Sequence, residues 1–298
     1  MVSVIIPVYN AEKYVEHAIE SVLSQPEVSN IYLVDDASTD RSLEVINRIA
    51  AGSDRVTFIT HSRMNIGAGA TRNLAIGLVD TPYISFLDAD DYYRLDRFTD
   101  SVRLLEADSN IDGVYGIANL CFETPADRIH YSKIIGSGKS TMDIQPPDDS
   151  SRLYRSLLDD TSGWFHLSTL LLRTNFLKKV GLFDPDLRQG EDTDMILRLA
   201  LAGNLAPTNG TKPLVVRNIS SGNTILNREQ NRFYKNHFSR KWFFLSIQKR
   251  LSLKYILYFL RSYLATHKNT CSSDTKYPIR LLRKTKLAFQ LILDGVVR

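Results

Sequence analysis

The stretch Tyr83-Ile84-Ser85-Phe86-Leu87-Asp88-Ala89-Asp90-Asp91 is an apolar, β-prone run that ends in three carboxylates, with no lysine or arginine among them. On an extended chain, side chains two residues apart point the same way, so Asp88 and Asp90 are expected to face one direction at a strand end. Such oxygen ligands suit Mg²⁺ or Mn²⁺, held together with the phosphates of a substrate. A strand that leaves into an aspartate-rich turn explains the run equally well.

Strands and amphipathic helices alternate along the chain on either side of this stretch. Residues 2–8 are apolar at odd and even positions alike, which predicts a strand buried on both faces. Alternation of strands with helices is typical of an α/β fold with a mostly parallel, doubly wound sheet. The further predicted elements are helices at 12–25, 43–49, 70–79, 98–105 and 195–202, and strands at 31–34, 55–60, 113–122, 163–173 and 213–219.

Polar or glycine-rich segments follow the carboxyl ends of four predicted strands. They are Tyr9-Asn10, Asp35-Asp36, the loop 65–69 and the acidic run 88–91. In sheets of this kind ligands bind outside the carboxyl ends of the strands, so four such segments predict one site. An ordinary loop explains any one of them alone.

The segment Gly67-Ala68-Gly69 opens a predicted helix, and Arg72 lies in its first turn. Backbone N–H groups and the positive end of a helix dipole attract an anion, which suggests a diphosphate. The glycine spacing matches neither a Walker loop nor a full dinucleotide fingerprint.

The later part of the chain holds three further candidate residues and one candidate loop. Residues 123–150 are predicted to form a loop or hairpin region over the site. Trp164 is either a platform for a sugar ring or a core residue, and His166 is either a structural histidine or an acid–base group. Gly190 permits a sharp turn before Glu191 and Asp192, where an active-site carboxylate often lies. The helix dipole alone explains Asp194.

Charge divides the chain after Asn227. Residues 228–298 hold 16 Lys/Arg against 3 Asp/Glu, whereas residues 1–227 hold 21 against 30. We expect a main domain at 1–227 and a basic helical extension at 228–298. Cys121 and Cys271 have no metal-type spacing, and the chain shows neither an apolar leader nor a membrane span. These features favour a cytoplasmic protein.

Five motifs in order resemble family 2 of the inverting glycosyltransferases, which bind nucleotide sugars through a GT-A type α/β fold. The resemblance covers residues 2–220 approximately. The motifs are Val4-Ile5-Ile6-Pro7-Val8-Tyr9-Asn10, Val34-Asp35-Asp36-Ala37-Ser38-Thr39-Asp40, Asn65-Ile66-Gly67-Ala68 with Arg72-Asn73, Leu87-Asp88-Ala89-Asp90-Asp91, and Gly190-Glu191-Asp192.

The resemblance implies a role for each matched residue. The nucleoside would be held by Pro7, Tyr9 and Asp36, with Asp36 accepting a hydrogen bond from the base and Asp35 supporting it. Asn10 is a further donor-site candidate. Asp88 and Asp90 would address ribose and diphosphate through Mg²⁺ or Mn²⁺, with Asp90 the main metal ligand. Asp192 would be the general base beside Glu191. The other donor-site candidates are Asn65, Gly67, Arg72, Trp164 and His166.

By the same resemblance, the protein would transfer one sugar from a UDP-linked donor to a saccharide or lipid-linked acceptor during synthesis of cell-surface polysaccharide or lipopolysaccharide. Many relatives carry a metal-binding histidine after the late strand, whereas this chain has Arg217-Asn218-Ile219-Ser220. Two alternatives are a catalytically silent sugar-nucleotide-binding module and a sugar nucleotidyltransferase. The latter normally has a glycine-rich, basic loop after its first strand, and Tyr9-Asn10-Ala11-Glu12 is not one.

The extension interleaves basic residues with aromatic and apolar ones. It is either a subdomain packed on the main domain or a peripheral attachment to an anionic membrane on its inner face. No nucleic-acid-binding motif accompanies its charge, so a nucleic-acid partner is not expected.

Overall fold

The computed structural model describes residues 1–61, 64–135, 141–142, 152–159, 163–208, 212–220 and 228–267. The chain divides into two compact units between Leu226 and Asn227. The first unit is an α/β fold, and the described part of the second is a pair of helices. Among the described residues, no helix is both long enough and apolar enough to cross a membrane.

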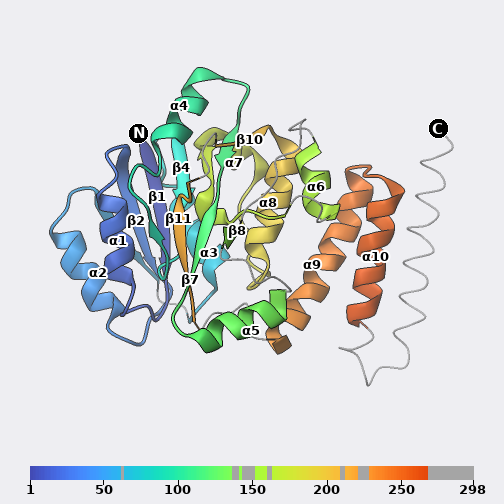
Figure 1. The fold of residues 1–298 in the computed structure, drawn as a ribbon, viewed down its shortest axis with the longest axis horizontal. Helices are drawn as coiled ribbons and strands as arrows, with labels where there is room; N and C mark the ends of the chain where they lie inside the picture. Colours follow the sequence, from blue (N-terminus) through green and yellow to red (C-terminus); the bar gives the residue numbers. More distant parts are fainter. Residues whose placement is uncertain are drawn as a thin grey trace. The chain divides into compact units, whose positions relative to one another are not determined.

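A seven-stranded sheet forms the centre of the first unit (Figure 1). Its strand order is β10-β6-β9-β4-β1-β2-β3, and β9 runs antiparallel to both of its neighbours while the other pairs are parallel. The mostly parallel sheet predicted from the sequence is therefore confirmed. The strands are β1 Val2–Val8, β2 Val28–Asp35, β3 Val56–Thr60, β4 Tyr83–Phe86, β6 Gly113–Tyr115, β9 Leu171–Arg173 and β10 Leu205–Pro207.

Strand β1 is buried along its whole length, as the unbroken apolar run predicts. Helices α1 and α2 lie side by side next to the sheet, α3 contacts β1 and β2, and α6 and α7 pack against α8 (Figure 1). The helices of this unit are α1 Val15–Leu23, α2 Ser42–Ala51, α3 Ala68–Ile76, α4 Thr99–Ala107, α6 Leu153–Asp159, α7 Thr174–Val180 and α8 Glu191–Ala202.

The strand predicted over residues 113–122 is two strands in two different sheets. β6 belongs to the main sheet, whereas β7 (Ala118–Phe122) pairs in a four-stranded sheet of order β5-β11-β7-β8. The chain bends at Gly116, where a Cβ atom would collide with the Leu214 side chain. The other strands are β5 Tyr92–Tyr93, β8 Thr141–Met142 and β11 Val215–Ile219.

Two other predicted segments differ from the structure. Instead of a loop or hairpin, the region after residue 123 begins with helix α5 (Pro125–Ile135), where Thr124 and Asp127 exchange side-chain-to-backbone hydrogen bonds of 3.0 and 3.2 Å. The part of that prediction at 136–140 and 143–150 lies outside the described residues. In the strand predicted over 163–173, only β9 is a strand, preceded by the 3₁₀ turn Leu167–Thr169 (η2).

The described part of the second unit consists of α9 (Arg228–Gln248) and α10 (Leu253–His267). The two helices run antiparallel, since Asn236 donates to Thr266 over 2.9 Å and Ser239 lies 2.8 Å from Ser262. The rings of Trp242 and Phe259 stack with their centroids 5.6 Å apart. The predicted helical character of the extension is confirmed for these residues.

A close approach at Gly203, the residue that ends α8, supports the packing of the first unit. A Cβ atom there would collide with the Phe176 ring and lie 2.7 Å from Asp112 Oδ2. We expect Gly203→Ala to lower the free energy of unfolding by roughly 1–3 kcal/mol, because a filled core has no room for the methyl group. Urea denaturation is the measurement. Gly77→Ala, where the methyl group meets nothing within 4 Å, is the control; equal midpoints for both variants would contradict the prediction.

Candidate active site

The sheet register brings the predicted polar segments to one edge. Val8 lies beside Asp35 across the β1–β2 ladder, and Asp35 lies beside Thr60 across the β2–β3 ladder. On the other side of β1, Ile5 pairs with Phe86, two residues before Asp88. The carboxyl ends of β1, β2, β3 and β4 therefore meet, and their four loops share this edge of the sheet.

Asp36 organises the glycine-containing loop. Its carboxylate accepts hydrogen bonds from the backbone N–H groups of Ile66 and Gly67 at 2.7 and 2.9 Å, and His61 Nε2 lies 3.1 Å away. Two backbone donors near the N-terminus of α3 thus already bind an internal anion. Asp36 is only 2% exposed, so the hydrogen bond from a base that the resemblance implies at this residue stays a prediction. His61 was not singled out from the sequence.

Asn10 and Asp35 shape the neighbouring loop. Asn10 has a positive φ of 49°, and its side chain accepts from Thr39 N at 2.8 Å while its own N–H donates to Ser38 Oγ at 3.1 Å. Asp35 accepts from Ser38 N at 3.3 Å. Pro7 is buried within β1, whereas Tyr9 is 48% exposed and offers its ring to solvent at this edge.

Arg72 is buried between two carboxylates. Its Nη2 lies 2.5 Å from Asp88 Oδ1 and its Nη1 lies 3.3 Å from Glu191 Oε1, while its guanidinium carbon lies 5.3 Å from the centroid of the Phe183 ring. Burial disfavours the charge on Arg72, but Asp88 and Glu191 outweigh burial and raise its pKa. The arginine placed near the donor by resemblance is therefore a charged link between the end of β4 and the start of α8.

Two further contacts join α3 to the segment that leads into α8. The Asn73 amide donates to Phe183 O at 2.8 Å and accepts from Phe183 N at 2.9 Å. Arg188 Nη2 donates to Asn65 O at 2.8 Å, next to Gly67, which has a φ of 91°. The loop after β3 and the candidate catalytic segment are thus held together.

Helix α8 begins with the turn predicted at Gly190. This glycine has a φ of 77°, in the left-handed region, and Glu191 and Asp192 follow in the first helical turn. Asp192 is partly buried and accepts from Thr193 N at 2.6 Å. Asp194 is fully buried and pairs with Arg198 at 2.9 Å, so it has a structural role. Burial, followed by the charge of Asp192, raises the pKa of Glu191 to about 7 against the opposing effect of Arg72.

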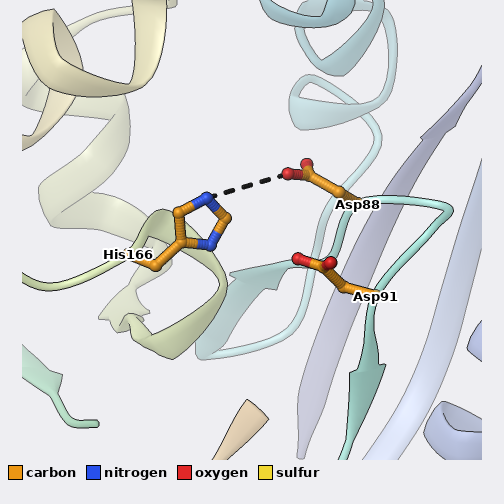
Figure 2. A group of neighbouring side chains, drawn as sticks. All are labelled: Asp88, Asp91 and His166. Atoms are coloured by element: carbon orange, nitrogen blue, oxygen red, sulfur yellow. Dashed lines mark ion pairs between the residues drawn. The ribbon is translucent and has the colours of Figure 1, made fainter. Parts of the chain in front are cut away.

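Asp88, Asp91 and His166 form a group that could hold a metal ion, with ligand atoms within 4.8 Å of one another (Figure 2). His166 reaches it from the irregular segment before η2, and its Nε2 lies 3.8 Å from Asp88 Oδ2. The sequence motifs had predicted Asp90, rather than Asp91, as a metal ligand beside Asp88. Asp90 is partly buried, and its backbone carbonyl accepts from Asn218 Nδ2 at 2.6 Å. Trp164, also partly buried, precedes His166 by two residues.

The carboxylates of the group suit Mg²⁺ or Mn²⁺, but burial raises the pKa of Asp91 well above its ordinary value against the opposing charge of Arg217. Arg72 contacts Asp88, and Arg217 Nε lies 3.6 Å from Asp91 Oδ2. Burial and the charge of Arg217 lower the pKa of His166 well below its ordinary value, so its ring is neutral. His166 Nδ1 accepts from Ser168 N at 3.4 Å, which leaves the proton on Nε2; metal binding through Nε2 requires the other tautomer.

The model of the family described as Glycosyl transferase family 2 matches residues 3–165. The chain belongs to this family. A poly(ribitol-phosphate) β-glucosyltransferase of Bacillus spizizenii (strain ATCC 23059 / NRRL B-14472 / W23) is 38% identical over 94 residues, which cover 30% of this chain and 15% of that protein. For the first three curated relatives, the match spans 39%, 32% and 15% of their own lengths, so the chain matches only a part of each.

Two solved structures share the GT-A fold of this family 2 chain. S. aureus TarS 1–349 in complex with UDP-GlcNAc has a TM-score of 0.63 at 18% identity, covering 92% of this chain and 74% of TarS 1–349. The mannosyltransferase PcManGT from Pyrobaculum calidifontis, in complex with GDP-Man and Mn²⁺, has a TM-score of 0.57 at 18% identity, covering 97% and 80%. At this identity the likeness shows the fold alone.

The raised pKa of Glu191 predicts a pH-dependent stability. The folded protein keeps the proton on the Glu191 carboxyl up to about pH 7, whereas the unfolded chain loses it near pH 4.5. The stability that this proton contributes is therefore complete below pH 4.5 and is lost as the pH rises to about 7. In Glu191→Gln, we expect the free energy of unfolding to decrease less steeply between pH 4.5 and about 7.

Urea denaturation at a series of pH values measures this fall. Glu106→Gln, at an exposed residue in the last turn of α4, is the control and should keep the slope of the parent protein. If Glu191→Gln also keeps that slope, Glu191 does not titrate as described.

Proposed function

We propose that this protein is an inverting glycosyltransferase. It moves one sugar from a nucleotide-sugar donor to a hydroxyl group of a saccharide or lipid-linked acceptor, in the synthesis of cell-surface polysaccharide or lipopolysaccharide. The observation that carries the proposal is the buried link Asp88–Arg72–Glu191, because it holds the acidic end of β4 and the first turn of α8, with Asp192, at one edge of the sheet.

The reaction needs a base for the acceptor hydroxyl and compensation for the charge on the departing nucleoside diphosphate. Asp192 is the base in this proposal. Its carboxylate takes the hydroxyl proton while the acceptor oxygen attacks the anomeric carbon and the bond from that carbon to the diphosphate oxygen breaks. A single displacement of this kind inverts the anomeric centre. Arg72 contacts Glu191, the residue before Asp192, and so supports the position of the start of α8.

A divalent cation completes the proposed charge compensation. Asp90 and Asp88 would hold Mg²⁺ or Mn²⁺ by resemblance to the family, and Asp91 and His166 lie close enough to Asp88 to contribute. When bound, the ion would stabilise negative charge on the leaving diphosphate. The Mn²⁺ complex of PcManGT supports this part of the proposal.

We propose a UDP-linked donor, held at the end of β1 and β2 by Pro7, Tyr9, Asn10, Asp35 and Asp36, with Asn65, Gly67 and Trp164 nearby in the donor site. The UDP-GlcNAc complex of TarS supports the choice of nucleotide. The name of the B. spizizenii relative supports a cell-surface acceptor. Such a reaction would take place on the cytoplasmic side of the membrane.

Turnover with Asp192→Asn tests the function. The parent protein is screened against a panel of nucleotide sugars with Mg²⁺ or Mn²⁺, by donor hydrolysis and by the rise in melting temperature that binding produces. With the donor so found, Asp192→Asn should keep donor binding but lose a factor of about 10²–10⁴ in turnover, because it lacks the base.

Asp100→Asn, at an exposed residue of α4, is the control and should retain the turnover of the parent. Full turnover in Asp192→Asn would move the base to Glu191 or His166. A parent protein that binds a nucleotide sugar but neither hydrolyses nor transfers it would be a silent binding module. Formation of a nucleotide sugar from a nucleoside triphosphate and a sugar phosphate would identify a nucleotidyltransferase.

We further propose residues 1–227 as the catalytic domain and residues 228–298 as an extension that binds an anionic membrane surface. In the described part, exposed basic residues accompany the exposed aromatic rings of Phe233, Phe244 and Tyr258. Basic residues and interfacial aromatic rings together favour the headgroup region of a bilayer. The exposed basic residues are Lys235, Arg240, Lys249, Arg250, Lys254 and Arg261.

Reversing the charge of Lys249, Arg250 and Lys254 to glutamate should abolish co-sedimentation of the full chain with anionic vesicles, since each cation near such a surface contributes about 1 kcal/mol. Moderate salt should weaken binding by the parent protein. Reversing three exposed arginines of the first unit, Arg41, Arg48 and Arg103, is the matched control and should leave binding intact. Equal sedimentation of the parent with neutral vesicles, or none with either kind, would refute the proposal.

A further inference from the structure

Arg217 lies on β11 and directs its side chain at the acidic group. The side chain is 13% exposed, and its Nε is 3.6 Å from Asp91 Oδ2. Burial disfavours its charge, but Asp91 and then Asp88 outweigh burial and raise its pKa, so the guanidinium stays charged.

Within the described part of the chain, the guanidinium of Arg217 has N–H groups that can still form hydrogen bonds. Both Arg217 Nε and Asp91 Oδ2 are buried without a hydrogen-bond partner, because the 3.6 Å between them exceeds hydrogen-bonding distance. Arg217 Nη1 contacts the Met142 sulfur at 3.2 Å, and a thioether is a weak acceptor. A guanidinium has five donors in a planar fork that matches the oxygens of a phosphate.

The other basic side chains around the acidic group already contact partners within the protein. Arg72 contacts Asp88 and Glu191 on opposite sides of its guanidinium. His166 Nε2 faces Asp88 Oδ2 at 3.8 Å, and its Nδ1 accepts from Ser168 N at 3.4 Å. Among the described residues that face Asp88 and Asp91, Arg217 is therefore the cation available to an incoming ligand.

We propose that Arg217 binds the diphosphate of the donor and thereby replaces part of the charge compensation that a divalent metal would provide. The inference rests on the proposed function, because it assigns a residue to the leaving group of that reaction. Arg217 offers its fork to the diphosphate oxygens, and its charge opposes the negative charge that develops there.

The position of Arg217 also weakens the binding of a metal ion by Asp88 and Asp91. Arg217 would place a fixed positive charge close to a cation held by Asp88 and Asp91, and would compete with that cation for Asp91 Oδ2. Arg217 should therefore act in opposite directions on the two ligands: it strengthens binding of a diphosphate without metal and weakens binding of the metal. Loss of a residue that only supported the fold would not strengthen binding of one ligand while weakening binding of the other.

The experiment is calorimetry on the full chain with UDP, GDP and inorganic pyrophosphate in EDTA, and with Mn²⁺ alone. The parent protein should bind a diphosphate in EDTA, and Arg217→Gln should weaken that binding about 10- to 100-fold, because a charge-assisted contact is lost. Arg217→Lys should lie between the two, since it keeps the charge and loses the fork. Arg217→Gln should bind Mn²⁺ more tightly than the parent protein.

Arg41→Gln, at an exposed arginine next to the start of α2, controls for the loss of one positive charge and should match the parent in both titrations. Melting temperatures of the variants establish that they are folded, and Arg217→Lys serves in place of Arg217→Gln if the latter is not. Diphosphate binding in EDTA that is equal in the parent and all Arg217 variants would overturn the inference.

Failure of the inference and failure of the proposed function have different signatures. A parent protein that binds the nucleoside diphosphate with Mn²⁺ but not in EDTA overturns the role of Arg217 and leaves the glycosyltransferase proposal in place. Weaker binding of both the diphosphate and Mn²⁺ in Arg217→Gln would show a structural role only. A parent protein that binds no nucleotide with or without Mn²⁺ contradicts both.

Discussion

The buried charge of Arg72 is the constraint on which the candidate site depends. A guanidinium removed from water must be paired and hydrogen-bonded, because an uncompensated buried charge costs several kcal/mol. Asp88 and Glu191 supply that compensation from the end of β4 and the start of α8. Breaking either contact would leave a buried charge with half of its partners. The acidic strand end and the candidate base are thus positioned by electrostatics more than by the loops between them.

The fold was largely predictable because its signals are local. The apolar run of β1, the amphipathic pattern of α1 and the turn at Gly190 each appear within a few neighbouring residues. The division of residues 113–122 into β6 and β7 was not predictable, because it depends on the approach of Leu214, about a hundred residues later in the chain. Helix α5 did have a local signal, since Thr124 and Asp127 have the spacing of a capping box.

The candidate site was predictable in its location but not in its contacts. The strand pattern predicted that Asp36, the loop before Arg72 and Asp88 lie at one edge, and the register shows this for the ends of β1, β2 and β4. Which partner each one contacts depends on residues far away in the chain, so no pattern could reveal that Asp36 binds the N–H groups of Ile66 and Gly67. Arg217 was not predicted for the same reason: the sequence showed only that residues 217–220 lack a histidine.

The link through Arg72 also bears on how the protein is made. Its two partners are 16 and 119 residues further along the chain. At about 5–20 residues per second, Glu191 leaves the ribosome on the order of ten seconds after Arg72. During that interval the nascent sheet cannot bury Arg72 with both partners in place. We therefore expect the amino-terminal half to remain loosely packed around α3 until synthesis has passed α8.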